Sequence, residues 1–234
     1  MPTAPDSVSD ITYQIHVNDS KTYTYQFTDK NGLLSFINNS KTDDLSWAKL
    51  EHHQCPNCPL NSKEVEYCPI AENFGGILKD WNNEKSFSSV ELTVNSNNRV
   101  INASTSAQKA LGSLLGLIIA TSNCPYTQFF RPMAQFHLPL ASSSETSYRA
   151  ISTYLLTLFF RKQAGEDIDF NLTGLSKIYE NMHELNIYIK KRLVDAVEQD
   201  AALNAVMVLD IFTINSTNFL DEELQELKKY FSIL

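Results

Sequence analysis

All four cysteines of the chain are followed directly by proline, and this pattern constrains the fold more than any other feature of the sequence. The pairs are Cys55-Pro56, Cys58-Pro59, Cys68-Pro69 and Cys124-Pro125. Because the 234 residues include only eight prolines, chance rarely gives such a pattern. Proline fixes its own φ and has no backbone N–H, so each pair stiffens the turn that presents the sulfur. Sulfurs presented in this way suit a metal or cluster site.

The spacing of the cysteines narrows the kind of site. Cys55 and Cys58 form the Cys-x2-Cys pair of a metal knuckle, Cys68 adds a third sulfur, and Cys124 is a possible fourth. Zinc on four thiolates is the simplest occupant, because structural zinc sites are closed and four-coordinate. An iron–sulfur cluster needs the same four thiolates, and Cys-Pro pairs occur in ferredoxins. A disulfide or free thiols are the remaining alternatives.

The expected role of such a site is structural. Four thiolates leave no open position for a substrate, which favours a metal staple over a catalytic centre. With Cys124 as a ligand, the metal would join the two halves of the chain, and metal binding would become part of folding. We therefore expect a metal-binding protein with a binding or regulatory role, more plausibly not an enzyme. The alternative is an iron–sulfur redox protein or sensor using the same cysteines.

Histidines and one arginine are further candidates. His52 and His53 adjoin the knuckle, where they could replace a cysteine or act as partly exposed partners of the ligands. His137 lies in a proline-rich connector and could be a general base or a ligand, although a hydrogen-bonded histidine is the simpler interpretation. Arg149 could meet an anion in a pocket with His137, or form an ion pair.

Glu180 and His183 form a Glu-x-x-His unit on an expected helix. Di-iron bundles use this unit twice, but here it occurs once, so a solvated helix face explains it well enough. The chain contains no dinucleotide fingerprint, Walker loop, nucleophile elbow or His-Glu-x-x-His motif. The sequence therefore identifies no reaction.

Apolar periodicity predicts an α+β fold. We expect a disordered tail at 1–10, a small antiparallel β-rich unit with the cysteine knuckle at 11–102, and an α-helical bundle at 103–234. Gly112 and Gly116 lie on one helix face and would let another helix approach. In the first unit we expect hairpins at 11–27 and 90–101, a short helix at 33–37, a strand at 47–51, and a helix at 70–81 broken by glycines. In the second we expect helices at 107–120, 142–163, 172–193 and 200–214, and from 221 onward.

Charge and composition limit the partners. A net charge of −8 repels phosphate backbones, so nucleic acid is not expected as a partner. The polar N-terminus predicts neither a signal peptide nor an anchor, and the longest apolar run is too short to cross a bilayer. These observations predict a cytoplasmic protein without a membrane partner, whose partner is an unknown protein or small molecule.

Several strings taken together resemble an uncharacterised bacterial family. They are Cys-Pro-x-Cys-Pro-Leu at Cys55 to Leu60, Tyr67-Cys68-Pro69-Ile70-Ala71, Leu111 to Gly116, Asn123-Cys124-Pro125, and His137-Leu138-Pro139 through Glu145-Thr146. The resemblance runs over most of the chain. It implies a bacterial, cytoplasmic protein and implies nothing about mechanism.

Overall fold

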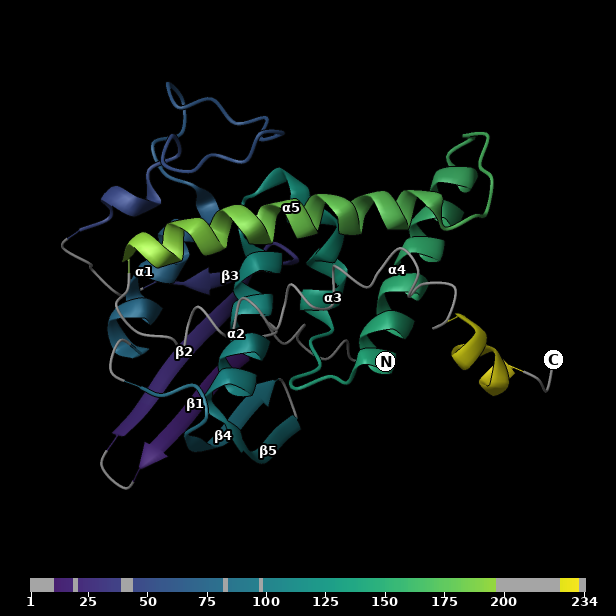
Figure 1. Ribbon diagram of the computed structural model, residues 1–234. Coiled ribbons are helices and arrows are strands. Elements are labelled where there is room, and N and C mark those ends of the chain that lie inside the picture. The colour runs from purple at the N-terminus through teal and green to yellow at the C-terminus, as the bar shows by residue number, and fades with distance from the viewer. Residues whose placement is uncertain are drawn as a thin grey trace.

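The computed structural model describes residues 11–18, 21–38, 44–81, 84–96, 99–196 and 224–231. An antiparallel sheet near the N-terminus is followed by helices, which confirms the predicted α+β class (Figure 1). The expected tail at 1–10, the helix at 200–214 and the start of a helix at 221 lie outside the described residues. Residues 224–231 are helical.

The sheet has five strands in the order β3-β2-β1-β4-β5, and every neighbouring pair is antiparallel. Its central strand β1 alternates buried Ile11, Tyr13 and Ile15 with more exposed residues, as a strand with one buried face requires. The strands are β1 (Ile11–Asn18), β2 (Lys21–Lys30), β3 (Leu33–Ile37), β4 (Ser89–Ser96) and β5 (Arg99–Ser106). Both predicted hairpins are present.

The segment Leu33–Ile37 is strand β3, so the prediction of a short helix there was wrong. The reason lies in the preceding turn. Asn31 and Gly32 both have positive φ, 59° and 81°, as a two-residue hairpin turn of the primed type requires. Asp29 supports this turn by accepting a hydrogen bond from the Gly32 N–H. The turn sends the chain back along β2, and pairing with β2 then determines the conformation.

Helices α1 (Pro69–Trp81) and α2 (Ala107–Thr121) share one core with the buried face of the sheet. The expected break at Gly75 and Gly76 does not occur: α1 is continuous, and both glycines are buried. Burial of this helix face outweighs the low helix propensity of glycine. At the end of α1, the Trp81 indole N–H donates to the Tyr25 hydroxyl at 2.8 Å and ties α1 to β2.

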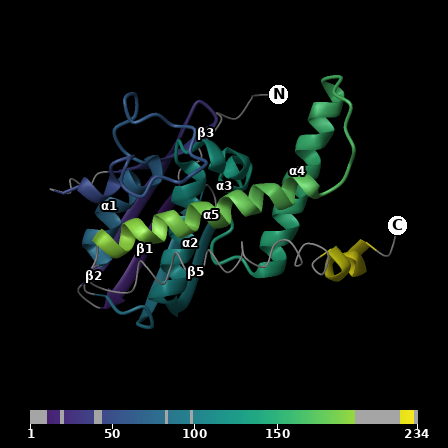
Figure 2. The same ribbon diagram turned by 45° about the horizontal axis from the view of Figure 1, so that its top comes forward.

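The remaining helices lie over this core or extend beyond it, away from the sheet (Figures 1 and 2). They are η1 (Ser46–Ala48), η2 (Pro125–Phe130), α3 (Arg131–Gln135), α4 (Ser143–Gln163), α5 (Thr173–Ala196) and η3 (Lys229–Phe231). Figure 2 shows α5 running across α2, while α4 projects away from the sheet. The predicted capping box of Ser142 and Glu145 begins α4.

The predicted strand at 47–51 is not a regular strand. Its first part is the short helix η1, and Lys49 makes a single antiparallel bridge with Tyr67. Two backbone hydrogen bonds flank the bridge, from Leu50 N to Glu66 O and from Cys68 N to Ala48 O, both at 2.8 Å. The bridge and its hydrogen bonds therefore close a long loop between Leu50 and Glu66. This loop carries Cys55 and Cys58.

Candidate metal centre

Cys55 and Cys58 lie at the two ends of a tight turn. The Cys58 N–H donates to the Cys55 carbonyl oxygen at 3.0 Å, and Pro56 occupies the second position of the turn. Proline is favoured at that position because its fixed φ matches the turn. The first Cys-Pro pair thus orients the two sulfurs of the knuckle.

Cys68 and Cys124 each lie directly before a helix that begins with proline. Cys68 precedes Pro69 of α1, and Cys124 is the N-cap residue of η2. Proline suits the first helical position, where its missing N–H has no intrahelical partner to lose.

The four thiols influence one another electrostatically. Burial raises the pKa of Cys55 to about 12, and the nearby Cys68 and Cys58 add to this rise. Burial also raises the pKa of Cys124 to about 12, and Cys68, Cys55 and Cys58 contribute in the same direction. Interactions of this kind fall off over a few ångströms to about 10 Å. Three segments of the chain therefore bring their sulfurs to one region, where all four are free thiols.

Tyr126 joins two of these segments and was missed in the sequence. Its hydroxyl donates to the Asn57 carbonyl oxygen at 2.5 Å, which ties η2 to the turn between Cys55 and Cys58. The Asn57 side chain in turn donates to the Asn181 side-chain oxygen on α5 at 3.2 Å. Only the position of Tyr126 two residues after Cys124 could have marked it in the sequence.

Arg192 on α5 is the cation of this region, and it too was missed. It is only 2% exposed, and its guanidinium donates to the carbonyl oxygens of Trp47, Lys49 and Leu50 at 3.1, 2.6 and 2.9 Å. Burial lowers the pKa of Arg192, whereas Cys68, Cys55 and Cys58 oppose that change. In the described part of the chain no carboxylate pairs with it. One feature of the sequence could have identified Arg192, because it is a charged residue on the apolar stripe of the expected helix.

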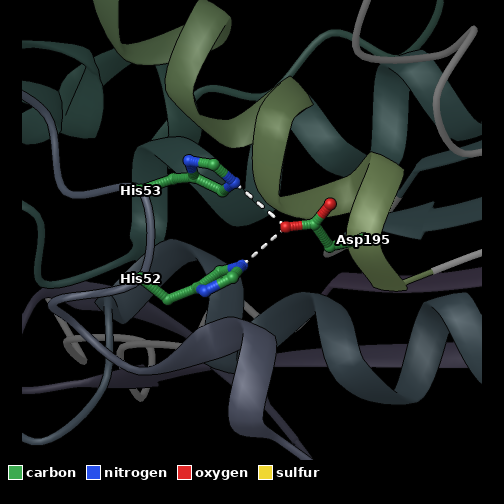
Figure 3. Close-up of side chains that lie close together, drawn as sticks. All are labelled: His52, His53 and Asp195. Atoms are coloured by element: carbon green, nitrogen blue, oxygen red, sulfur yellow. Dashed lines mark hydrogen bonds and ion pairs between the residues drawn. The ribbon is translucent and has the colours of Figure 1, made fainter.

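His52 and His53 meet Asp195 at the end of α5 (Figure 3). The Nε2 atoms of both histidines lie within hydrogen-bond distance of the same Asp195 oxygen, at 2.8 and 3.0 Å. These hydrogen bonds, from His53 first and then His52, lower the pKa of Asp195. His53 reaches this position with a left-handed φ of 47°. The contacts anchor the loop before the knuckle to α5.

The same trio has the ligand types of a cation site, two imidazoles and a carboxylate. Its three ligand atoms lie within 4.8 Å of one another, and over residues 11–196 and 224–231, apart from the short gaps, it is the only such group. All three side chains are more than one-third exposed. Glu180 and His183 lie on α5, and neither belongs to a group of this kind.

His137 and Arg149 line a cavity of about 700 Å³ beside α2. The Tyr13 hydroxyl contacts Nε2 of His137 and, at 2.8 Å, the hydroxyl of Ser113. Burial, and then the Arg149 charge, lower the pKa of His137 to about 3, so the imidazole is neutral at pH 7. Arg149 donates through Nη2 to the carbonyl oxygens of Met133 and Phe136. Gly112 and Gly116, where we expected a second helix to approach, also line this cavity.

Comparison with known proteins gives a family but no activity. A family model described as "Domain of unknown function (DUF6901)" matches residues 11–232. No curated protein and no solved structure matches the chain. In the described part of the chain, no helix has the length and apolar character needed to cross a membrane.

Proposed function

We propose that this chain, which belongs to the family of the domain of unknown function DUF6901, binds a metal centre through Cys55, Cys58, Cys68 and Cys124. The centre joins the long loop, the start of α1 and the segment after α2, and its role is binding or regulation. The observation that carries the proposal is the convergence of four free thiols from three segments, close enough that Cys58 and Cys68 add to the rise in the pKa of both Cys55 and Cys124. Thiolates so arranged are soft ligands suited to zinc or iron.

The charge around the thiols supports the same proposal. Arg192 is a buried cation whose three hydrogen bonds go to neutral carbonyls. A buried charge without a counter-ion is costly, so an anionic group beside it would be stabilising. Four thiolates around a divalent metal carry a net charge of about −2, as do four thiolates around an oxidised cubane cluster. The metal centre therefore supplies the missing anion.

Zinc is the simpler occupant to infer from the sequence, and an iron–sulfur cluster on the same four cysteines is the alternative. Tetrahedral zinc with bonds of about 2.3 Å holds its sulfurs about 3.8 Å apart. In the described structure no three of these sulfurs lie within 4.8 Å of one another. A cubane cluster binds each thiolate to a different iron and so holds the sulfurs further apart. In that case the protein is a redox protein or sensor.

Metal analysis of protein purified without oxygen tests the proposal. We expect either about four irons with sulfide and visible absorption, or about one zinc in a colourless protein. Cys124→Ser should lose or loosen that metal. The matched control is His53→Gln, which disrupts the imidazole–carboxylate trio and should leave the metal content unchanged. Protein without metal, or a metal that survives Cys124→Ser and is lost with His53→Gln, would overturn the proposal.

A further inference from the structure

The cavity beside α2 is lined by polar groups whose hydrogen-bonding capacity is not used. Asn186 is 2% exposed, and in the described structure its side-chain oxygen accepts no hydrogen bond. A buried acceptor left unpaired costs about 1–3 kcal/mol, so a group that donates to Asn186 would bind favourably. The Tyr179 hydroxyl and the Nε and Nη1 groups of Arg149 also make no hydrogen bond among the described residues.

The charged side chains that line the cavity are cationic, and Glu145, which caps the start of α4, is the acidic group that acts on Arg149 from outside the lining. Arg149 and Lys109 line the cavity, and no acidic side chain is among the described residues that do. Ser142 and Ser143, at the N-terminus of the 21-residue helix α4, line it as well, and that end of a helix carries partial positive charge. The Nη2 hydrogen bonds to Met133 and Phe136 fix the Arg149 guanidinium and leave its other donors for a ligand. This arrangement suits a carboxylate.

The remaining lining is largely apolar, and α5 sets the spacing of the polar ends. Tyr179, Met182 and Asn186 follow one another at i, i+3 and i+7 on α5, and all three line the cavity. Seven residues of helix span about 10 Å. Burial raises the pKa of Tyr179, and the positive charge of Arg149 partly offsets this rise, which places the two side chains close together. The anion-binding end and the Asn186 end are therefore about 10 Å apart along the helix.

We infer that this cavity binds a small apolar carboxylic acid that carries a hydrogen-bond donor at the opposite end. The carboxylate accepts hydrogen bonds from Arg149 and Tyr179, the body packs on Leu117, Leu138 and Met182, and the distal donor reaches Asn186. A cavity of about 700 Å³ is in the range that encloses drug-sized ligands. Nothing in this inference requires the cysteine centre, so the two proposals can fail separately.

The test uses isothermal titration calorimetry with the whole chain and three ligands, a hydroxy acid and two compounds that each differ from it at one end only. They are ω-hydroxydecanoate, decanoate and decane-diol with both hydroxyls terminal. We expect ω-hydroxydecanoate to bind about tenfold more tightly than decanoate, because only it satisfies Asn186. We expect the diol to bind more weakly than the hydroxy acid by a similar factor. Equal binding of the diol and the hydroxy acid, or no binding of any of the three, would overturn the inference.

Variants of the protein then test which side chain binds each end of the ligand. Arg149→Gln should weaken both acids about tenfold and leave the diol unchanged, whereas the matched control Arg161→Gln, on the exposed far end of α4, should change none of the three. Asn186→Leu should reduce the hydroxy acid to the affinity of decanoate. The circular dichroism spectrum and unfolding midpoint of each variant verify folding. An Asn186→Leu protein that still prefers the hydroxy acid would refute the role of Asn186.

Discussion

His137 is a neutral imidazole between β1 and the cavity, and its environment predicts how acid affects stability. The pKa of His137 is lowered to about 3, against about 6.5 in an unfolded chain. The unfolded chain therefore binds the extra proton between these values. The stabilising effect is fully present above about pH 6.5 and is lost as the pH falls toward 3, by at most about 1.4 kcal/mol per pH unit.

We predict that His137→Gln makes the free energy of unfolding less sensitive to acid over this range. Glutamine keeps a polar group near the Tyr13 hydroxyl but does not titrate. Urea unfolding of both proteins at several values between pH 7 and pH 4.5 measures the two slopes, and carboxylates contribute equally to each. Identical slopes would show that His137 is protonated as easily in the folded chain as in the unfolded one.

At the scale of elements, α5 holds the cysteine-bearing loop through its last turns. Arg192 binds three backbone carbonyls before the knuckle, and Asp195 binds both histidines. We predict that Arg192→Leu lowers the free energy of unfolding by about 3 kcal/mol, since several buried carbonyls lose a charged donor. Arg161→Leu serves as the control and should have little effect, because the Arg161 side chain is exposed and pairs with the exposed Glu166.

Amide hydrogen exchange tests why Arg192→Leu lowers the free energy of unfolding. If Arg192 acts by holding the loop, the amides of Leu50, Cys58 and Cys68, which donate within or next to it, should exchange faster in Arg192→Leu. The exchange rates of amides at the centre of β1 should rise only as much as the change in global stability requires. Uniformly faster exchange would instead assign Arg192 to the core as a whole.

The elements that the sequence predicted correctly are those with a strong local signal. Alternation gave β1 and β2, and the Ser142–Glu145 capping box gave the start of α4. Where the signal was weak, tertiary contacts decided: β3 is only five residues long and follows its turn, and α1 passes through two buried glycines. The Cys-Pro pairs were visible because each acts on its own turn. Arg192 and Tyr126 were not, because their partners lie far away in sequence.

At the scale of the whole molecule, a large core joins the strands to α1, α2 and the second half of α5, and a second, smaller cluster packs α4 against the first half of α5. The larger core contains residues from β1 through the last turns of α5. The cysteines lie where the loop, α1, η2 and α5 meet. A metal there would cross-link segments that the core already holds together, and its removal would loosen the edge of the molecule.

We predict that removing the metal lowers the free energy of unfolding by several kcal/mol, because binding to the folded chain alone adds to its stability. Cys124→Ser should cost much less in metal-free protein than in the metal-bound protein. Chemical unfolding of all four forms, wild type and variant with and without metal, gives the comparison. A variant that is destabilised equally in both states would mean that Cys124 contributes by packing and not as a ligand.

The contacts of Arg192 also bear on the order of events during synthesis. The loop that carries Cys55 and Cys58 is held by a side chain that the ribosome adds more than a hundred residues later. The nascent chain must therefore expose the knuckle, the start of α1 and Cys124 before α5 arrives to fix them. If the chain binds the proposed metal, an ion that arrives before that point meets an open loop and one that arrives later meets a closed loop, so the growing chain would set the interval for insertion.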